Sequence, residues 1–232
     1  ARDPNDKNST REALFSFNKK IVNNIGKTLK EEVFKDDEQP LIIVLTNPVD
    51  SILKSFIETN NLDPKKTIGS GNQLDTFRFI QNLADKLHVN EHDIENAFVV
   101  GQHGKNMVYC FDQTKICGES ISNYMKNNNI SEEDIEDVCS STTNEGGKII
   151  AAAGATCFGP ASSVIAIIDS FIENKNEIFS LSVMHEDGNC FGYPVYVNNH
   201  GVEVVKNFNL TDKEKEELNN SINCINELDN LS

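Results

Sequence analysis

Several features that mark other protein classes are scarce or missing in this sequence. No apolar run approaches the roughly 20 residues that a membrane-spanning helix needs. The opening segment ARDPNDKNSTRE lacks the apolar core of a signal peptide. The six cysteines are scattered, without the close pairs of a thiolate zinc site or the density of a disulfide scaffold. We therefore expect a cytoplasmic protein with reduced, mostly buried thiols and no membrane partner.

Positive charge is also scarce. The chain has 21 Lys and Arg against 36 Asp and Glu, which gives a formal net charge of -15. No run of basic residues gathers the lysines and arginines onto one stripe, so phosphate backbones and anionic lipid surfaces are repelled. Nucleic acid is accordingly not expected as a partner.

What is present is enough apolar sequence for a hydrophobic core. With 232 residues, 38% hydrophobic and 25% charged, the chain is one domain or two closely packed ones. Its first third shows helical periodicity over residues 10–33, an apolar run LIIVLT at 41–46, a helical pattern at 50–62 and a short strand at 67–71. Strands in this β-α-β order pair in parallel, and the apolar run is typical of a central strand covered on both faces.

Beyond Gly71 the pattern indicates an α+β arrangement. We predict helices at residues 73–87, 131–154, 160–173 and from Thr211 onward, strands at 97–104, 178–183 and 192–205 with a turn at 198–201, and a hairpin at 105–118. The charged runs KEKEEL and EEDIED are interpreted as solvated helix faces. The expected fold class is therefore α/β, with a parallel sheet in residues 1–71 followed by an α+β domain in residues 72–232.

The segment LDTFRF places an acid and a base on one face of a predicted helix. Asp75 and Arg78 are at positions i and i+3, so one interpretation is a surface ion pair that contributes a few tenths of a kcal/mol. The other interpretation starts from the lead-in GSGN, which places both residues in the first turn at the junction of the two predicted domains, where clefts form. An arginine at this position can bind a carboxylate through two parallel hydrogen bonds, which lysine cannot form.

His103 follows an apolar strand in VVGQHGKN, between Gly101 and Gly104, which allow a backbone or a ligand to approach closely. A lone histidine is more often structural than catalytic. A histidine at a strand end is nevertheless well placed for proton transfer, and Asp75 is a suitable carboxylate to orient its imidazole. No role is assigned to the other histidines, His88, His92, His185 and His200.

The apolar strand ends in TNPVD, which contains an X-Pro step. A cis bond there would turn the chain at the carboxyl edge of the sheet. The alternative is an ordinary strand-terminating proline. Asn47 presents a donor and an acceptor toward the crevice at that edge.

Four segments together carry a resemblance to a known family. LTNPVD, IGSGNQLDTFRF, VVGQHGKNMV and GPASSVIAIIDSFI, in this order and at these separations, resemble the L-lactate/L-malate dehydrogenase family along almost the whole chain. The resemblance implies an NAD-dependent oxidoreductase that acts on a small 2-oxo or 2-hydroxy acid, usually as a homodimer or homotetramer. It also implies that His103 is the proton donor and acceptor, that Asp75 is its partner, and that Arg78 binds the substrate carboxylate.

The same resemblance assigns further residues to the cofactor and the substrate. It implies that Asn47 bonds near the reacting carbonyl and the nicotinamide ribose, with Leu45 and Thr46 along the path of NAD. It implies that Arg11 is the mobile-loop arginine that polarises the carbonyl, and that Thr156 lies near the substrate pocket.

Two features differ from the family pattern. The G-x-G-x-x-G turn that receives the pyrophosphate and the acidic residue that binds the adenosine ribose do not occur. We therefore expect an incomplete sequence, in which residues 1–71 are the C-terminal part of a Rossmann-type dinucleotide-binding domain and residues 72–232 are the catalytic domain. The loop between Arg2 and Arg11 is longer than in most relatives and resembles the extended loop of apicomplexan lactate dehydrogenases, although the chain has no tryptophan.

The resemblance leaves the substrate open between two acids. The segment IGSG and Thr156 look more like lactate enzymes, so L-lactate dehydrogenase is the favoured prediction. An L-malate dehydrogenase needs a cation for the second carboxylate, which Arg2 or Lys7 would supply. A third alternative is a non-catalytic relative that keeps the fold as a scaffold. The retention of both arginines, the acid and the histidine implied in catalysis argues against it, because a scaffold needs none of these groups.

Overall fold

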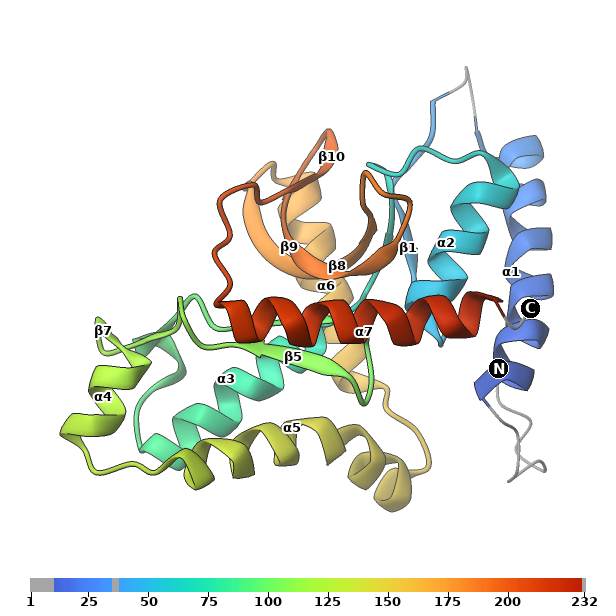
Figure 1. Cartoon of the computed structure of the whole chain (residues 1–232). Helices are drawn as coiled ribbons and strands as arrows, with labels where there is room; N and C mark the ends of the chain where they lie inside the picture. The colour runs from blue at the N-terminus through green and yellow to red at the C-terminus, as the bar shows by residue number, and fades with distance from the viewer. Residues whose placement is uncertain (1–10, 35–37, 231–232) are drawn as a thin grey trace.

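The computed structural model describes residues 11–34 and 38–230, which form a mixed α/β fold (Figure 1). The N-terminal part consists of helix α1 (Arg11–Glu32), strand β1 (Ile42–Val44), helix α2 (Val49–Asn60) and strand β2 (Thr67–Gly69). Strands β1 and β2 pair in parallel, so the β-α-β unit expected from the sequence is confirmed.

Helix α2 is held in the core by the spacing of its apolar residues. Val49, Ile52, Leu53 and Phe56 recur at helical intervals and are all buried. The helix ends at Asn61, a residue type that tolerates the left-handed conformation it adopts there (φ 49°). Helix α1 packs on the outer side of α2 (Figure 1).

The remaining elements alternate between short strands and longer helices. In chain order they are α3 (Gln73–Leu87), the 3-10 helix η1 (Glu91–Asp93), β3 (Ile94–Glu95), β4 (Phe98–Gly101), β5 (Met107–Cys110), β6 (Lys115–Ile116), β7 (Glu119–Ser120), α4 (Ile121–Asn127), α5 (Glu132–Ala153), α6 (Phe158–Ile172), β8 (Glu177–Met184), β9 (Cys190–Asn198), β10 (Gly201–Val204) and α7 (Asp212–Asn230). The predicted helices of this part are confirmed, and α5 begins at the capping box of Ser131 and ends at Gly154.

One sheet runs through the molecule in the strand order β1-β2-β8-β9-β4-β5, with β10 paired to β9. Strand β2 meets β8 antiparallel at Gly69 and Ser182, so the parallel pair joins the antiparallel strands without a break. The turn predicted at residues 198–201 is present and connects β9 to β10. Because of this strand order, residues near positions 45, 75, 103 and 182 lie in one region of the fold.

The apolar run at residues 41–46 is less buried than expected. Val44 is buried, Ile42 and Ile43 are half-buried, and Leu45 is 50% exposed. Among the described strands, β1 pairs only with β2 and is an edge strand. Within these residues, the expectation of a central strand covered on both faces is therefore wrong.

The hairpin expected at residues 105–118 is also wrong. Strand β5 pairs with β4 in the large sheet. Strand β6 turns away from it and pairs with β3 and β7 in a separate three-stranded sheet. Strand β5 therefore pairs with the strand before it in the chain and not with the strand after it.

Helix α7 lies across the middle of the molecule, against β4 and β5, and its C-terminal end approaches α2 (Figure 1). Its first turn carries the run KEKEEL, within which Glu214 is only 5% exposed. The Glu214 carboxylate accepts hydrogen bonds from the backbone N–H groups of Phe111 (2.7 Å) and Thr211 (2.7 Å). The prediction that this run is a solvated face is therefore wrong at Glu214, which fastens α7 to the end of β5.

All six cysteines are free thiols. Cys110 and Cys190 are buried, but Cys117 and Cys157 are exposed and the other two are half-buried, so the expectation of mostly buried thiols is wrong. No helix within the described ranges is both long and apolar enough to cross a membrane.

Candidate active site

A cavity of about 410 Å³ lies where the carboxyl end of β1, the start of α3 and the end of β4 face α5 and α6. Six of the residues singled out from the sequence line it: Leu45, Asn47, Asp75, Arg78, His103 and Thr156. Thr46 is not among the residues that line this cavity. The side chain of Arg11 lies outside the described part of the chain, as do Arg2 and Lys7.

The turn before α3 sets the position of the acid and the base. Gly71 has a φ of +49°, and a Cβ atom there would lie 2.3 Å from the backbone nitrogen of Ser182. Only glycine combines this left-handed conformation with so close an approach to β8. As a result the first turn of α3 begins directly against the sheet, and Asp75 and Arg78 line the cavity.

Asp75 and His103 form the shortest polar contact between side chains that line the cavity. The Nδ1 atom of His103 lies 2.7 Å from Oδ2 of Asp75, and the Asp75 residue is only 2% exposed. With Nδ1 engaged by the carboxylate, Nε2 is the ring nitrogen left for a ligand. This is the arrangement of a histidine whose tautomer and orientation are set by a buried acid.

The pKa of His103 is raised above its ordinary value. Burial acts in the opposite direction and lowers this pKa, because it disfavours the charged imidazolium. The negative charge of Asp75, the hydrogen bond to Asp75 and the charge of Asp50 raise it by more than burial lowers it. The imidazolium is therefore the form that the surrounding carboxylates favour.

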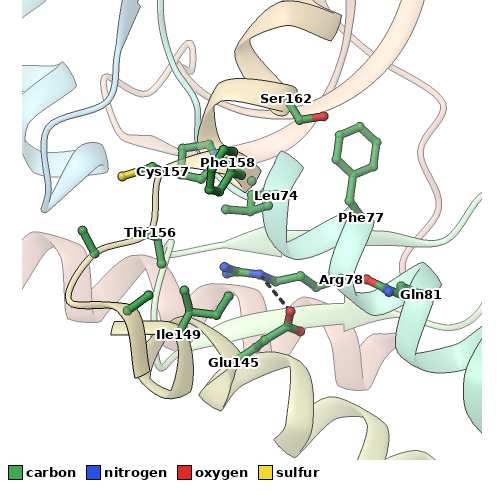
Figure 2. Close-up of a pocket in the computed structure, with 14 residues that line it drawn as sticks. Leu74, Phe77, Arg78, Gln81, Glu145, Ile149, Thr156, Cys157, Phe158 and Ser162 are labelled. Carbon is green, nitrogen blue, oxygen red and sulfur yellow. Dashed lines mark ion pairs between the residues drawn. The ribbon is translucent and has the colours of Figure 1, made fainter. Parts of the chain in front are cut away.

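Arg78 lies between two carboxylates. Its Nη1 atom is 3.5 Å from Oδ1 of Asp75, and its Nε is 3.7 Å from Oε1 of Glu145 on α5 (Figure 2). Arg78 is 8% exposed and Asp75 is 2% exposed. The interpretation of this pair as a surface ion pair is therefore wrong, because both partners are buried at the cavity wall.

Asp50, which the sequence analysis did not single out, is a second buried acid behind His103. Its Oδ2 accepts a hydrogen bond from the backbone N–H of His103 at 3.0 Å, and its Oδ1 accepts one from the hydroxyl of Ser182. Asp50 is 2% exposed and lies in the first turn of α2. The available signal was the acid of TNPVD directly after an apolar strand, but an acid in a first helical turn is common for reasons of helix electrostatics alone.

The loop that carries His103 is also held by α7. Ser221 accepts a hydrogen bond from the backbone N–H of Gln102 at 2.7 Å and donates its hydroxyl proton to the carbonyl oxygen of Asn106 at 2.5 Å. One serine thus bridges both sides of the His103 loop. No pattern in the sequence connects these positions, because the serine lies 119 positions from Gln102.

The bond between Asn47 and Pro48 is cis, so the turn considered from TNPVD is present. The carbonyl oxygen of Asn47 accepts a hydrogen bond from the side-chain amide of Asn18 on α1 at 2.8 Å. Asn47 as a residue is exposed and lines the cavity. This leaves its side chain available for a polar group of a ligand.

Around one cavity, the site offers an oriented histidine, a buried guanidinium and an exposed amide. This set suits a small anion with a polar group next to its carboxylate: the guanidinium binds the carboxylate and the histidine exchanges a proton with the neighbouring oxygen. Among the described residues, no group of three or more His, Cys, Asp or Glu is placed to hold a metal ion.

Comparisons with known proteins agree with this geometry. Residues 72–230 match the family model of the lactate/malate dehydrogenase alpha/beta C-terminal domain. The chain is 29% identical to a malate dehydrogenase of Aliarcobacter butzleri, covering 100% of this chain and 72% of that protein. It is 30% identical to an L-lactate dehydrogenase of Mycoplasma mobile, covering 93% of this chain and 68% of that protein.

A solved structure gives the same result at the level of the fold. The malate dehydrogenase of Plasmodium falciparum in complex with NADH superposes with a TM-score of 0.84 at 30% identity, covering 92% of this chain and 71% of that one. The family model covers α3 to α7, and the similarity to the Aliarcobacter butzleri protein extends over the whole chain, including the end of β1 at the cavity. The chain belongs to the lactate/malate dehydrogenase family.

Proposed function

We propose that this chain carries the substrate site of an NAD-dependent L-lactate dehydrogenase, which interconverts pyruvate and L-lactate. The observation that carries the proposal is the convergence of Asp75, Arg78 and His103 on one cavity. Each of the three supplies a function that a 2-oxo acid requires, and their contacts leave the histidine Nε2 as the ring nitrogen for a substrate.

Arg78 binds the substrate carboxylate through its planar guanidinium, which orients the ketone oxygen toward His103. During reduction, protonated His103 donates the Nε2 proton to that oxygen, and during oxidation the neutral ring takes the proton back from the hydroxyl group. Asp75 stabilises the imidazolium and holds the ring in place through Nδ1. The reduction thus consumes one proton and one hydride for each 2-oxo acid.

NAD, when bound, supplies or accepts the hydride. Asn47 and Leu45, at the carboxyl end of β1, line the same cavity as His103, and Thr46 lies between them in the chain. An exposed amide beside an apolar side chain suits the nicotinamide end of a dinucleotide, because ligand sites combine apolar walls with a few polar groups that fix orientation. We assign Leu45, Thr46 and Asn47 to this end of the cofactor.

The N-terminal elements are proposed to belong to the cofactor domain. In this assignment residues 1–71 are the C-terminal part of a Rossmann-type domain and residues 72–232 are the catalytic domain. The parallel pairing of β1 with β2 supports it, because ligands of such sheets bind at the carboxyl ends of the strands. Arg11, at the start of α1, is proposed as the loop arginine that polarises the substrate carbonyl.

Pyruvate is preferred to oxaloacetate in this proposal because the segment IGSG and Thr156, which lines the cavity, look more like lactate enzymes. Among the described residues that line the cavity, Arg78 is the only lysine or arginine. Arg2 and Lys7, the cations considered for a second carboxylate, lie outside the described part of the chain. L-malate dehydrogenase stays the second candidate, since relatives of similar identity carry that name. An inactive scaffold is the least favoured candidate function, because a scaffold does not need a histidine that is oriented by a buried acid.

We also propose that the protein is a homodimer or homotetramer and is cytoplasmic. Phe158, Ile165 and Ile172 of α6 are 92%, 58% and 72% exposed, and apolar side chains of this size are commonly covered by another subunit. Free thiols are typical of a reducing compartment. Light scattering of the purified full-length protein tests the oligomeric state, and a strict monomer would contradict this part.

The activity itself is tested by mixing the full-length protein with NADH and either pyruvate or oxaloacetate, and following the loss of NADH absorbance. We expect turnover of both acids, with a higher kcat/KM for pyruvate. The control is His103→Ala, in which the loss of the general acid should lower kcat about 100-fold or more. Turnover of neither acid would contradict the dehydrogenase proposal and favour the scaffold.

A further inference from the structure

Arg78 also lines a second cavity, of about 470 Å³ (Figure 2). It shares Leu74, Arg78, Thr156 and Pro160 with the cavity that contains His103. Its wall includes Glu145, a carboxylate that the mechanism above does not use. Arg78 therefore borders both the space for the substrate and the space that holds this extra acid.

Glu145 is held in position by α3. Its Oε2 accepts a hydrogen bond from Nδ2 of Asn82 at 3.5 Å, and the same amide group also donates to the hydroxyl of Thr142 at 2.9 Å. The Oε1 atom is the one that faces Nε of Arg78, at 3.7 Å. The Glu145 side chain is 29% exposed, so its charge is only partly screened by water.

The single positive charge of Arg78 is thus shared between two acids. Asp75 is also engaged with His103, at 2.7 Å, and is needed to orient the imidazole. Among the described residues, Glu145 contacts Arg78 and accepts the hydrogen bond from Asn82, and neither contact orients the histidine. A substrate carboxylate that approaches Arg78 therefore competes with Glu145.

We propose that Glu145 is a specificity-determining residue, which competes for Arg78 and disfavours dicarboxylic 2-oxo acids more than monocarboxylic ones. Coulomb repulsion increases with the charge of the ligand and decreases with distance, so the charge of Glu145 opposes a dianion more strongly than a monoanion, by up to about twice the free energy. The inference rests on the proposed function, since it concerns the carboxylate site of the same reaction. It names the residue by which this chain would favour pyruvate over oxaloacetate.

The test is Glu145→Gln in the full-length protein, compared with Glu136→Gln. Glutamine keeps the shape of the side chain and removes the charge. Glu136 is exposed on the same helix more than two turns away from Glu145. Its variant makes the same change in net charge at a greater distance from Arg78. In Glu145→Gln we expect KM to fall about 3-fold for pyruvate and up to about 10-fold for oxaloacetate, because a doubled charge at the same distance would square the smaller effect. In Glu136→Gln both values should stay within about 1.5-fold of the wild type.

A second variant checks that charge is the cause. Glu145→Asp keeps the negative charge on a shorter side chain, so its ratio of kcat/KM for oxaloacetate over pyruvate should stay near that of the wild type, whereas the ratio should rise by up to about 3-fold in Glu145→Gln. Equal ratios in all variants, or weaker binding of both acids in Glu145→Gln, would overturn the inference and leave the dehydrogenase proposal intact. A wild-type protein that turns over neither acid would overturn both. Melting temperatures of the three variants establish that each is folded.

Discussion

The backbone N–H of His103 donates a hydrogen bond to the carboxylate of Asp50 at 3.0 Å, while the imidazole of the same residue is bonded to Asp75 at 2.7 Å. Two buried acids from different helices, α2 and α3, therefore hold one histidine, one through its backbone and the other through its ring. This double fixation restricts both the loop and the side chain, so Nε2 of His103 has a defined position relative to Arg78. Each acid is expected to affect the chemistry in a different way.

Asp75 and His103 are expected to behave as one functional unit. Asp75→Asn removes the charge that stabilises the imidazolium, so kcat for pyruvate reduction should fall about 100-fold. Adding Asp75→Asn to His103→Ala should cost little more than His103→Ala alone, because the acid acts through the histidine. Steady-state kinetics of the two single variants and the double variant provide the cycle. Fully additive losses would show that the two residues act independently.

The pH dependence follows from the raised pKa of His103. Reduction needs the protonated ring, so kcat/KM for pyruvate should be constant at low pH and fall as the pH rises through this pKa, which is above the ordinary 6.5. The histidine also contributes folding stability that is fully present below its unfolded pKa and is lost as pH rises through the folded pKa. A pH profile of kcat/KM measures the midpoint.

Asp50→Asn should move the midpoint of that profile to lower pH, since the charge of Asp50 is one of the causes that raise the pKa of His103. Asp85→Asn is the matched control, because Asp85 is an exposed acid on α3 and its loss changes the net charge equally. The control profile should coincide with that of the wild type. An Asp50→Asn midpoint at or above the wild-type value would exclude this electrostatic role.

Arg78→Lys should keep the fold and weaken the binding of 2-oxo acids. A point charge on a flexible chain replaces a planar group that forms two parallel hydrogen bonds, and we expect KM for pyruvate to rise about 10- to 100-fold. Initial-rate kinetics with pyruvate and oxaloacetate give the values, with circular dichroism as the check on folding. An unchanged KM for both acids would remove Arg78 from substrate binding.

Gly71→Ala should destabilise the protein by more than about 2 kcal/mol, because it combines a left-handed backbone with a backbone clash. A Cβ atom at Gly71 would lie 2.3 Å from the nitrogen of Ser182, whereas Gly154, with a φ of +80°, has no atom within 4 Å of the corresponding position. Gly154→Ala is therefore the control for the conformation alone and should cost about 1 kcal/mol. Urea unfolding of both variants measures the difference, and equal losses would refute the clash.

Much of the fold was predictable because its signals are local. The boundaries of α3 and α5 follow from helical periodicity and from capping residues such as Ser131 and Gly154, which act within one turn. The parallel pairing of β1 and β2 follows from their β-α-β order. The partner of β5 was mispredicted although β4 directly precedes it in the chain, because β5 has a short turn on each side and local residue types do not decide across which turn it pairs.

The amino-acid sequence was enough to identify the candidate side chains: Asp75, Arg78 and His103 are residue types suited to proton transfer and carboxylate binding, in segments that resemble a dehydrogenase. Their surroundings depend on tertiary packing. Asp50 reaches the backbone of His103 across 53 positions, and Glu145 reaches Arg78 from a different helix. Neither contact leaves a periodic pattern or a short motif, since the distance between two side chains depends on how helices and strands pack. The carboxylate of Asp50, which helps to raise the pKa of His103, and the carboxylate of Glu145, which contacts Arg78, are therefore brought to these residues only by folding.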